Sequence, residues 1–313
     1  MDRASTFADP NAIAKLQRDF IPFAGDISEF AWRRTEVSRW FMQHGGKVNY
    51  KIRSADSVQG FYTLGADGTA YGFSNVRGAK TVNALLADAY SRFHAHKPPK
   101  VEIVVDKPKQ FANSPQPANT DVARVFTRVR PVPLGANSLN KGVGRDHLWI
   151  LGSDLKQIAA AGAAGSAFQM PQNLRMRIAR FNLLDNVRGQ PDPWQISEVK
   201  KASIRMTPVG RRGADMIYKL DGSFAMRNAA GDRGFEGTLK GELEIDVARN
   251  RVSWLRMIAD GTAWGESKFT AHGPVGKYPL VIAMLNVDDT LSRTVEPDSV
   301  SLGEQYFLPA SVK

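Results

Sequence analysis

The spacing of hydrophobic and polar residues changes part-way along the chain. In the first 95 residues, apolar positions recur every three to four residues, which is the period of amphipathic helices. Three helices are predicted, over residues 10–20, 26–45 and 80–94. The apolar run at residues 21–24 predicts a short strand. Residues 61–64 and 70–73 flank an Asp67-Gly68 turn, which predicts a β-hairpin.

In the second half, the period falls to two. Between residues 203 and 258, apolar side chains alternate with polar ones, as Tyr218 and Leu220 do with Lys219 and Asp221. Glycine- and asparagine-containing turns interrupt this alternation, which predicts a four-stranded antiparallel meander with one apolar face. Upstream of it, residues 122–132 predict a strand. Helices are expected to begin near Ser153, as a cap, and at Pro171.

These elements predict an α+β protein with two domains. Residues 1–97 form the first domain and residues 121–313 the second, which contains an antiparallel sheet and a few helices. Residues 98–120 form a proline-rich linker that includes an apolar run at 101–105, expected as a strand. The element order of the first domain resembles a thioredoxin-like α/β domain. A thioredoxin carries a Cys-x-x-Cys motif near the position of residues 24–27 here, and this chain has no cysteine. Thiol–disulfide exchange is therefore excluded.

Composition predicts a folded, soluble protein, since 42% of the residues are hydrophobic and 23% charged. No apolar run reaches the roughly 18 residues of a membrane span. The first residues lack the apolar core of a signal peptide. A mature form would look the same, so the compartment is left open, with a periplasmic or secreted location expected in that case. Oligomeric state is also left open.

The formal net charge of +11 is concentrated in one segment. Residues 171–213 contain nine Lys or Arg residues and three acidic ones. This segment is either a patch for an anionic partner or a solvated basic surface. Neither a nucleic-acid-binding motif nor interleaved aromatic residues accompany the charge, which argues against a nucleic-acid partner and leaves a small-molecule or anionic ligand.

Candidate chemistry centres on residues 144–194, where polar, charged and aromatic residues lie between predicted elements. An imidazole beside a carboxylate can act as a general base, which makes His147 the leading candidate. Neighbouring side chains of a strand point apart, so a distant carboxylate is the alternative partner to Asp146. The catalytic candidates are His147, Asp146, Asp185, Glu266 and His272. The ligand-binding candidates are Arg145, Arg188, Trp149, Trp194 and Trp264.

Each candidate also has a structural interpretation. His147 and Trp149 are then packing residues at a strand end, and Arg188 is an ion-pair partner of Asp185 or Asp146 rather than a clamp for an anion. Trp149 and Trp194 are expected to be mainly buried. The spacing of His94 and His96 does not place them on one helix face, so no metal site is predicted. Dinucleotide, phosphate-loop and hydrolase motifs are absent from the sequence, and no cofactor is expected.

Three segments of the second domain resemble an uncharacterised family of bacterial proteins whose N-terminal region is thioredoxin-like and lacks the Cys-x-x-Cys motif. These segments are residues 145–150, 180–189 and 263–266. The family has a histidine where this chain has Asn182, so the resemblance does not support a metal role there. It implies a domain organisation and no activity.

Two functions follow as hypotheses. The first is a non-redox binding or scaffold protein with an interdomain groove for an anionic or amphipathic ligand. The second is a hydrolase with His147 as the general base, with or without a metal. Convergence of His147, His272, Asp185 and Glu266 at one place would favour the hydrolase.

Overall fold

The computed structural model forms two compact units, residues 1–113 and 114–313, which are treated separately. The residues described are 6–7, 9–25, 36–52, 59–76, 78–96, 116–131, 138–267, 270–287, 293 and 295–310. The division between the units lies within the segment expected as a linker.

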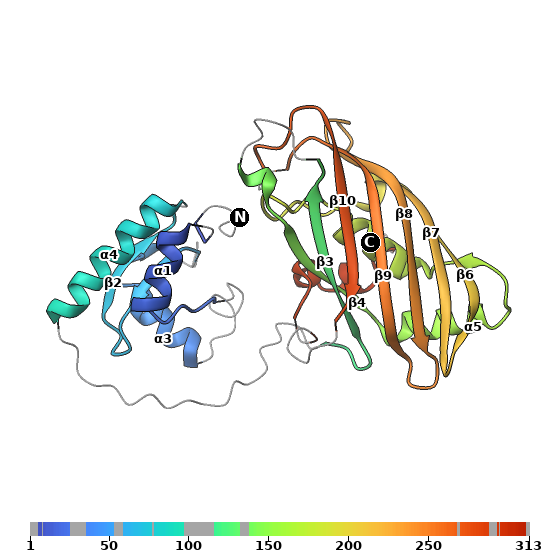
Figure 1. Cartoon of the computed structure of the whole chain (residues 1–313), viewed down its shortest axis with the longest axis horizontal. Coiled ribbons are helices and arrows are strands. Elements are labelled where there is room, and N and C mark those ends of the chain that lie inside the picture. The colour runs from blue at the N-terminus through green and yellow to red at the C-terminus, as the bar shows by residue number, and fades with distance from the viewer. Residues whose placement is uncertain are drawn as a thin grey trace. The chain divides into compact units, whose positions relative to one another are not determined.

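Unit 1 packs helices against a small hairpin (Figure 1). Its elements are α1 (Pro10–Asp19), α3 (Glu36–Gly45), β1 (Phe61–Leu64), β2 (Ala70–Ser74) and α4 (Ala79–His96), with a 3-10 turn at Tyr50–Ile52. The Asp9 carboxylate accepts a hydrogen bond from the Ala12 N–H and so caps α1, with proline at the first helical position. The antiparallel pairing of β1 with β2 confirms the predicted hairpin.

The thioredoxin-like interpretation of unit 1 stays a prediction. Among its described residues, the only strands are the two of the hairpin, whereas a thioredoxin sheet needs further strands. Residues 21–24 are described and are not a strand, so that prediction is wrong; Ile21 and Phe23 are exposed, and no neighbouring strand pairs with them. The expected strand at 101–105 and most of the expected helix at 26–35 lie outside the described residues.

Unit 2 is built on one large antiparallel sheet of eight strands (Figure 1). Its order is β4-β3-β10-β9-β8-β7-β6-β5, so the expected meander β6–β9 is extended on one side by strands from both ends of the unit. The strands are β3 (Asp121–Val129), β4 (Gly144–Ile150), β5 (Phe168–Gln169), β6 (Val199–Arg212), β7 (Asp215–Arg227), β8 (Gly234–Asp246), β9 (Arg251–Trp264) and β10 (Lys277–Asn286). The α+β class with an antiparallel sheet and few helices is therefore confirmed.

Helices cover one face of this sheet, called here the inner face (Figure 1). They are α5 (Gly152–Gly162) and α6 (Gln172–Arg177), which continues as a π-helical turn (Ile178–Asn182). Short helical turns lie at Ser138–Lys141, Ile196–Glu198 and Asp298–Leu302, and α7 (Glu304–Phe307) follows the last of them. Leu151 rather than Ser153 precedes α5, because Asp154 accepts a hydrogen bond from the Leu151 N–H.

The inner face carries the main hydrophobic core. Alternate residues of the long strands, such as Leu220, Leu239, Met257 and Ile282, are buried there against the helices. A cavity between α6 and the sheet holds only about 10 Å³, which is too small for a ligand. The intervening residues of each strand point to the opposite face, called here the outer face, where the exposed side chains of the sheet lie.

Candidate functional site

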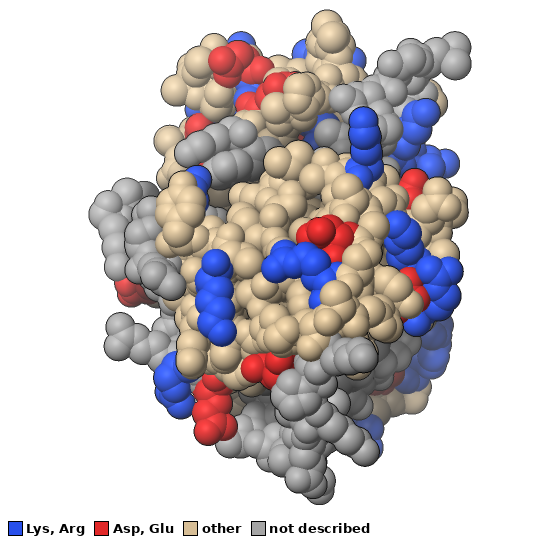
Figure 2. Space-filling model, turned by 90° about the vertical axis from the view of Figure 1, so that its left-hand side faces the viewer, with Lys and Arg blue, Asp and Glu red and all other residues tan. Residues whose placement is uncertain are grey.

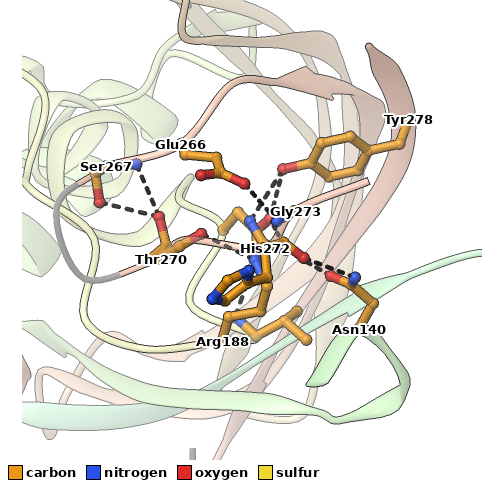
Figure 3. Close-up of polar contacts among 10 residues, drawn as sticks. Asn140, Arg188, Glu266, Ser267, Thr270, His272, Gly273 and Tyr278 are labelled. Carbon is orange, nitrogen blue, oxygen red and sulfur yellow. Dashed lines mark hydrogen bonds and ion pairs between the residues drawn. The ribbon is translucent and has the colours of Figure 1, made fainter. Parts of the chain in front are cut away.

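The predicted site residues fall at two separate places in unit 2. Arg188, Glu266 and His272 gather around Gly273, which lies in the loop between β9 and β10 (Figure 3), and Asp185 joins them through its ion pair with Arg188. A Cβ atom placed on Gly273 would lie 3.0 Å from Arg188 Nη2 and 3.4 Å from Glu266 Oε1, so this glycine lies between the guanidinium and the carboxylate. We call these residues the Gly273 cluster.

Arg188 is the buried centre of the Gly273 cluster, with 1% of its surface exposed. Its Nε donates to the Thr270 carbonyl at 3.0 Å, and its Nη1 donates to Asn140 Oδ1 at 3.0 Å and pairs with Asp185 Oδ2 at 2.8 Å. Nη2 faces the Tyr278 hydroxyl at 3.4 Å. With these contacts the guanidinium fastens the β9–β10 loop to the rest of the unit, which favours the structural role of Arg188 over an anion clamp.

Asp185 connects two of these neighbours. Its Oδ2 accepts a hydrogen bond from the Tyr278 hydroxyl at 2.6 Å, and its Oδ1 accepts one from the Val187 N–H. Burial, and next the Asp185 charge, raises the pKa of the Tyr278 phenol. Burial lowers the pKa of the Arg188 guanidinium, but Asp185 and Tyr278 outweigh it, and the net direction is upward. The three groups therefore form a closed unit in which tyrosine keeps its proton and the ion pair stays charged.

Glu266 and His272 are the exposed members of the Gly273 cluster. Glu266 Oε1 accepts a hydrogen bond from the Gly273 N–H at 2.6 Å. His272 has a φ of +70° and its carbonyl accepts from Asn140 Nδ2, so its backbone rather than its imidazole is fixed. An acid and an imidazole thus share one loop, as expected. No hydrogen bond between their side chains occurs in the described part of the chain.

His147 and Asp146 lie elsewhere, on edge strand β4. Asp146 Oδ1 accepts hydrogen bonds from the backbone N–H groups of His147 and Asp298, at 2.7 and 2.9 Å, and Oδ2 accepts from Asn182. The carboxylate therefore holds backbone and does not orient the imidazole, as the alternation of a strand requires. Among the described residues, no hydrogen bond or ion pair joins His147 to Asp185, Glu266 or His272.

Both residues have shifted pKa values. Burial, and next the charge of Asp298, raises the pKa of Asp146 to about 8, although three hydrogen bonds oppose this shift. Burial, and next the charge of Arg124 directly across on β3, lowers the pKa of His147 to about 4. His147 is consequently neutral at pH 7, able to accept a proton but a weak base.

The tryptophans differ in exposure. Trp149 and Trp194 are buried, as expected, and their indole N–H groups donate to the carbonyls of Val295 and Leu183. They are packing residues and are not available at a surface. Trp264 is half-buried, with the Lys277 ammonium 4.6 Å above its ring. Arg145 is exposed on β4, near the Phe126 ring.

The basic segment 171–213 is not one surface, and this corrects the expectation that it could be. Arg177, Arg180 and Arg188 are buried. Arg177 pairs with Asp154 at 2.7 Å and donates to the carbonyls of Tyr306 and Phe307, and Arg180 donates to the carbonyl of Pro309. Carbonyls at the end of α7 attract cations, which explains why the two guanidiniums turn inward.

Another basic region lies on the outer face of the sheet. The outward residues of β10, β3 and β4 include no Asp or Glu, because the acids of these strands face inward or lie at their ends. One cross-strand row runs Ile258–Ala283–Phe126–Arg145, and adjacent rows bring Arg256 opposite Leu285 and Arg128 opposite Val281. We call these eight residues, with Trp254, the basic sheet face.

The outer face of β7 and β8 has a different pattern. Lys219 lies directly opposite Glu242, and Asp221 lies directly opposite Lys240. Opposite charges at such cross-strand positions neutralise one another. Glu242 also lies directly opposite Arg256 on β9, so Arg128 and Arg145 are the two cations of the basic sheet face that have no acidic residue in register on the described neighbouring strands.

Unit 1 exposes a third kind of surface. Large apolar side chains, including Ile13, Trp40, Tyr90 and Phe93, are 37–41% exposed there. In the view of Figure 2, uncharged residues predominate across the middle of the face, with a few Lys or Arg and Asp or Glu side chains among them. Such a surface offers little to an anionic ligand.

Most residues of the Gly273 cluster and of the basic sheet face were not predicted from the sequence. Asn140, Thr270 and Tyr278 complete the Gly273 cluster, and nothing local in the sequence marks them as partners of Arg188. The basic sheet face had a usable signal: Arg124, Phe126 and Arg128 alternate with apolar residues in a predicted strand, so they share its outer face. The sequence pattern does not show which strands lie beside this predicted strand.

Within the described residues, no group of three or more His, Asp or Glu side chains is arranged to hold a metal ion. None of the helices described there combines the length and the apolar character needed to cross a membrane. Comparison of the chain with protein-family models, with curated proteins and with solved structures finds no match.

Proposed function

We propose that this chain is a binding protein without redox chemistry, and that the basic sheet face takes an anionic, amphipathic ligand. The observation that supports this best is the row Ile258–Ala283–Phe126–Arg145, in which apolar side chains lead across three strands to an exposed cation. Because the chain has no cysteine, it has no thiol with which to act on a disulfide.

The chemistry of the face matches such a ligand in two ways. An apolar tail lying along the row shields Ile258, which is 45% exposed, from water. Burial of roughly 200 Å² of apolar surface contributes about 5 kcal/mol. Exposed charge pairs with Arg128 and Arg145 add up to about 1 kcal/mol each. After the cost of immobilising the ligand, we expect a dissociation constant between micromolar and millimolar.

The test uses dodecanoate as the probe, below its micelle concentration, with calorimetry on the full chain. The double substitution Arg128→Gln/Arg145→Gln should weaken binding about ten-fold or more, the effect of losing two contacts of that size. Arg205→Gln/Lys219→Gln is the matched control, since it removes the same charge from β6 and β7, outside the basic sheet face, and should leave binding within about two-fold. Equal weakening by both pairs would contradict the proposal.

A neutral analogue separates the two contributions. Dodecanol has the same tail without the carboxylate, so its binding should be weaker than that of dodecanoate and insensitive to Arg128→Gln/Arg145→Gln. Raising the salt concentration should weaken only dodecanoate binding, because screening acts on the exposed charges and not on the apolar contact. Stronger binding of dodecanol would mean that the arginines do not contribute.

Hydrolysis is the second candidate, supported by the gathering of Asp185, Arg188, Glu266 and His272 around Gly273. In this alternative His147 is the predicted base, or Glu266 and His272 act together. Turnover of p-nitrophenyl acetate and of p-nitrophenyl phosphate is the measurement. Loss of a positioned base lowers turnover about 10²–10⁴-fold. His147→Gln and His272→Gln should identify which imidazole is used, and an equal background rate in both variants would exclude this alternative for the two substrates.

A further inference from the structure

We infer that the partner of the basic sheet face is the surface of an anionic lipid bilayer, to which unit 2 binds peripherally. The inference rests on the proposed function and narrows it from an amphipathic anion to an assembled layer of such anions. It follows from how the cations are spread, how the apolar residues lie between them, and how the aromatic rings are covered.

The cations of the face are distributed over a surface and do not converge. Arg145 is on β4, Arg128 is on β3, and Arg256 is on β9, which is three strands away from β4 in the sheet. Neighbouring strands lie about 4.8 Å apart, so the outer two of these strands are separated by about 14 Å. A ligand with one anionic group can contact Arg128 and Arg145, which lie on neighbouring strands, but it does not also reach Arg256. A bilayer surface offers an anion to each of them at the same time.

Apolar side chains lie between the cations. Ile258 and Trp254 are 45% and 38% exposed, and Ala283, Phe126 and Leu285 are half-buried beside them. Tryptophan with an apolar neighbour suits the boundary between headgroups and acyl chains. A sheet surface with apolar residues within a set of arginines therefore fits a surface whose charged layer covers an apolar one.

The arrangement fits single-stranded nucleic acid less well. Bases bind by stacking on open aromatic faces. Both rings of the basic sheet face are already associated with guanidiniums: Arg256 lies 5.0 Å from the centre of the Trp254 ring, and Arg145 lies 5.9 Å from the centre of the Phe126 ring. Phosphates would meet the arginines, but the bases would find neither ring open.

The charge pattern favours the β3–β4 end of the sheet as the part of unit 2 that faces the bilayer. On β8, Glu242 lies opposite both Lys219 on β7 and Arg256 on β9, and Asp260 on β9 lies opposite Val281. Arg128 and Arg145, farther along the sheet, have no acidic residue in register on the described neighbouring strands. The exposed cations of β6 lie at the opposite edge, so loss of vesicle binding in Arg128→Gln/Arg145→Gln distinguishes the two ends.

The experiment is co-sedimentation of the full chain with vesicles of phosphatidylcholine alone, and with vesicles in which about a third of the lipid is phosphatidylglycerol. We expect binding to the second kind only. A basic residue near such a surface contributes about 1 kcal/mol, so Arg128→Gln/Arg145→Gln should lower the partition coefficient about 10- to 30-fold. Arg205→Gln/Lys219→Gln, on β6 and β7, should change it by no more than about two-fold.

Two further variants keep the test decisive. Arg128→Lys/Arg145→Lys preserves the charge and should retain most of the vesicle binding, so a loss seen only with glutamine cannot be ascribed to misfolding. Ile258→Ser should reduce the part of the binding that persists at high salt, since that part comes from the apolar row.

The outcomes separate the inference from the proposed function. Binding of monomeric dodecanoate without binding of anionic vesicles overturns the bilayer inference and leaves the proposed function intact. Failure of both overturns both. Vesicle binding that survives Arg128→Gln/Arg145→Gln places the membrane contact elsewhere and overturns the inference. Tighter binding of poly-glutamate, in competition with vesicles, identifies an acidic polypeptide as the partner and also overturns it.

Discussion

The two edges of the large sheet are protected in opposite ways. At the β4 edge, the N–H and C=O groups that point away from the sheet belong to His147, Trp149 and Leu151. All six of these groups have hydrogen-bond partners. Asp146 accepts a hydrogen bond from the His147 N–H, and Asn182 donates one to the His147 C=O. The Tyr306 hydroxyl accepts from the Trp149 N–H, and Arg177 donates to the Trp149 C=O. Asp154 accepts from the Leu151 N–H, and N–H groups at the start of α5 donate to the Leu151 C=O. The polar residues that mark this stretch in the sequence therefore close an edge, which is a structural role.

At the other edge, β6 is covered by a strand of only two residues, β5. Its protection comes from the strand itself. A bulge lies between Pro208 and Gly210, and Arg205, Arg211 and Arg212 are exposed along it. Proline and cations are the usual means of preventing edge-to-edge association. The β4 edge, called here the closed edge, thus depends on side chains that are distant in the sequence. The β6 edge, called here the open edge, depends on its own residues. Substitutions at the two edges should therefore have different consequences.

Arg177→Met should have the largest effect, because it breaks the closed edge at its centre. It leaves the Asp154 carboxylate, 2% exposed, without its cation, and frees the carbonyls that Arg177 holds. Removing one partner of a buried pair costs about 3–5 kcal/mol. Urea denaturation measures the loss. Arg211→Met is the control at the open edge, where the arginine is exposed, and it should cost less than about 0.5 kcal/mol. Similar losses for both would remove the distinction between the edges.

Tyr306→Phe should have the next effect. It deletes the hydroxyl that accepts the Trp149 N–H at 3.0 Å and keeps the ring packed against Trp149 and Phe181. A buried donor left unsatisfied costs about 1–3 kcal/mol. The control is Tyr218→Phe, since the Tyr218 hydroxyl is buried without a hydrogen-bond partner in the described part of the structure. Thermal unfolding should show a loss for the first variant and no loss, or a gain, for the second. The reverse order would contradict the role given to Tyr306.

Asp146 should make the closed edge sensitive to pH. Its pKa is raised to about 8 in the folded chain, so the folded state binds a proton that the unfolded state releases above pH 4. Stability should therefore fall as the pH rises toward 8 and level off beyond it. His147, with its pKa lowered to about 4, has the opposite effect on stability, which rises with pH up to about pH 6.5. Between pH 6.5 and 8 only the Asp146 effect remains, and Asp146→Asn should abolish this slope in melting temperature. A slope that persists in the variant would assign it to another group.

At the open edge the expected effect on stability is smallest. Pro208→Val with Arg205→Thr should change the unfolding free energy by less than about 0.5 kcal/mol, as exposed substitutions usually do. It should nevertheless increase association between copies, because a flatter, less charged edge is left. Light scattering over a concentration series is the measurement. Lys219→Thr, on the interior strand β7, removes a charge without changing an edge and should leave the scattering unchanged. Unaltered association of the edge variant would mean that the bulge alone protects β6.

Much of the fold was predictable because the signal was local. The alternation of Tyr218, Leu220 and their neighbours defined the meander, and Asp9-Pro10 defined the start of α1. Candidate residues near one another in the sequence were also found, since Glu266 and His272 do share a loop. Asp146 does not orient the His147 imidazole, in line with the alternation of a strand, because its carboxylate binds backbone instead.

By itself, the sequence determined the period of each element, the polar and apolar side of each strand, and the absence of thiol chemistry, since these depend on residues a few positions apart. Only the tertiary structure decided that Arg177 turns inward to carbonyls 129 and 130 residues away, and that β10, β3 and β4 extend the meander. The same extension places Arg128 and Arg145 on one face with Arg256. Pairing between distant strands depends on the combined burial of the whole core, and no local pattern records which strands will be neighbours.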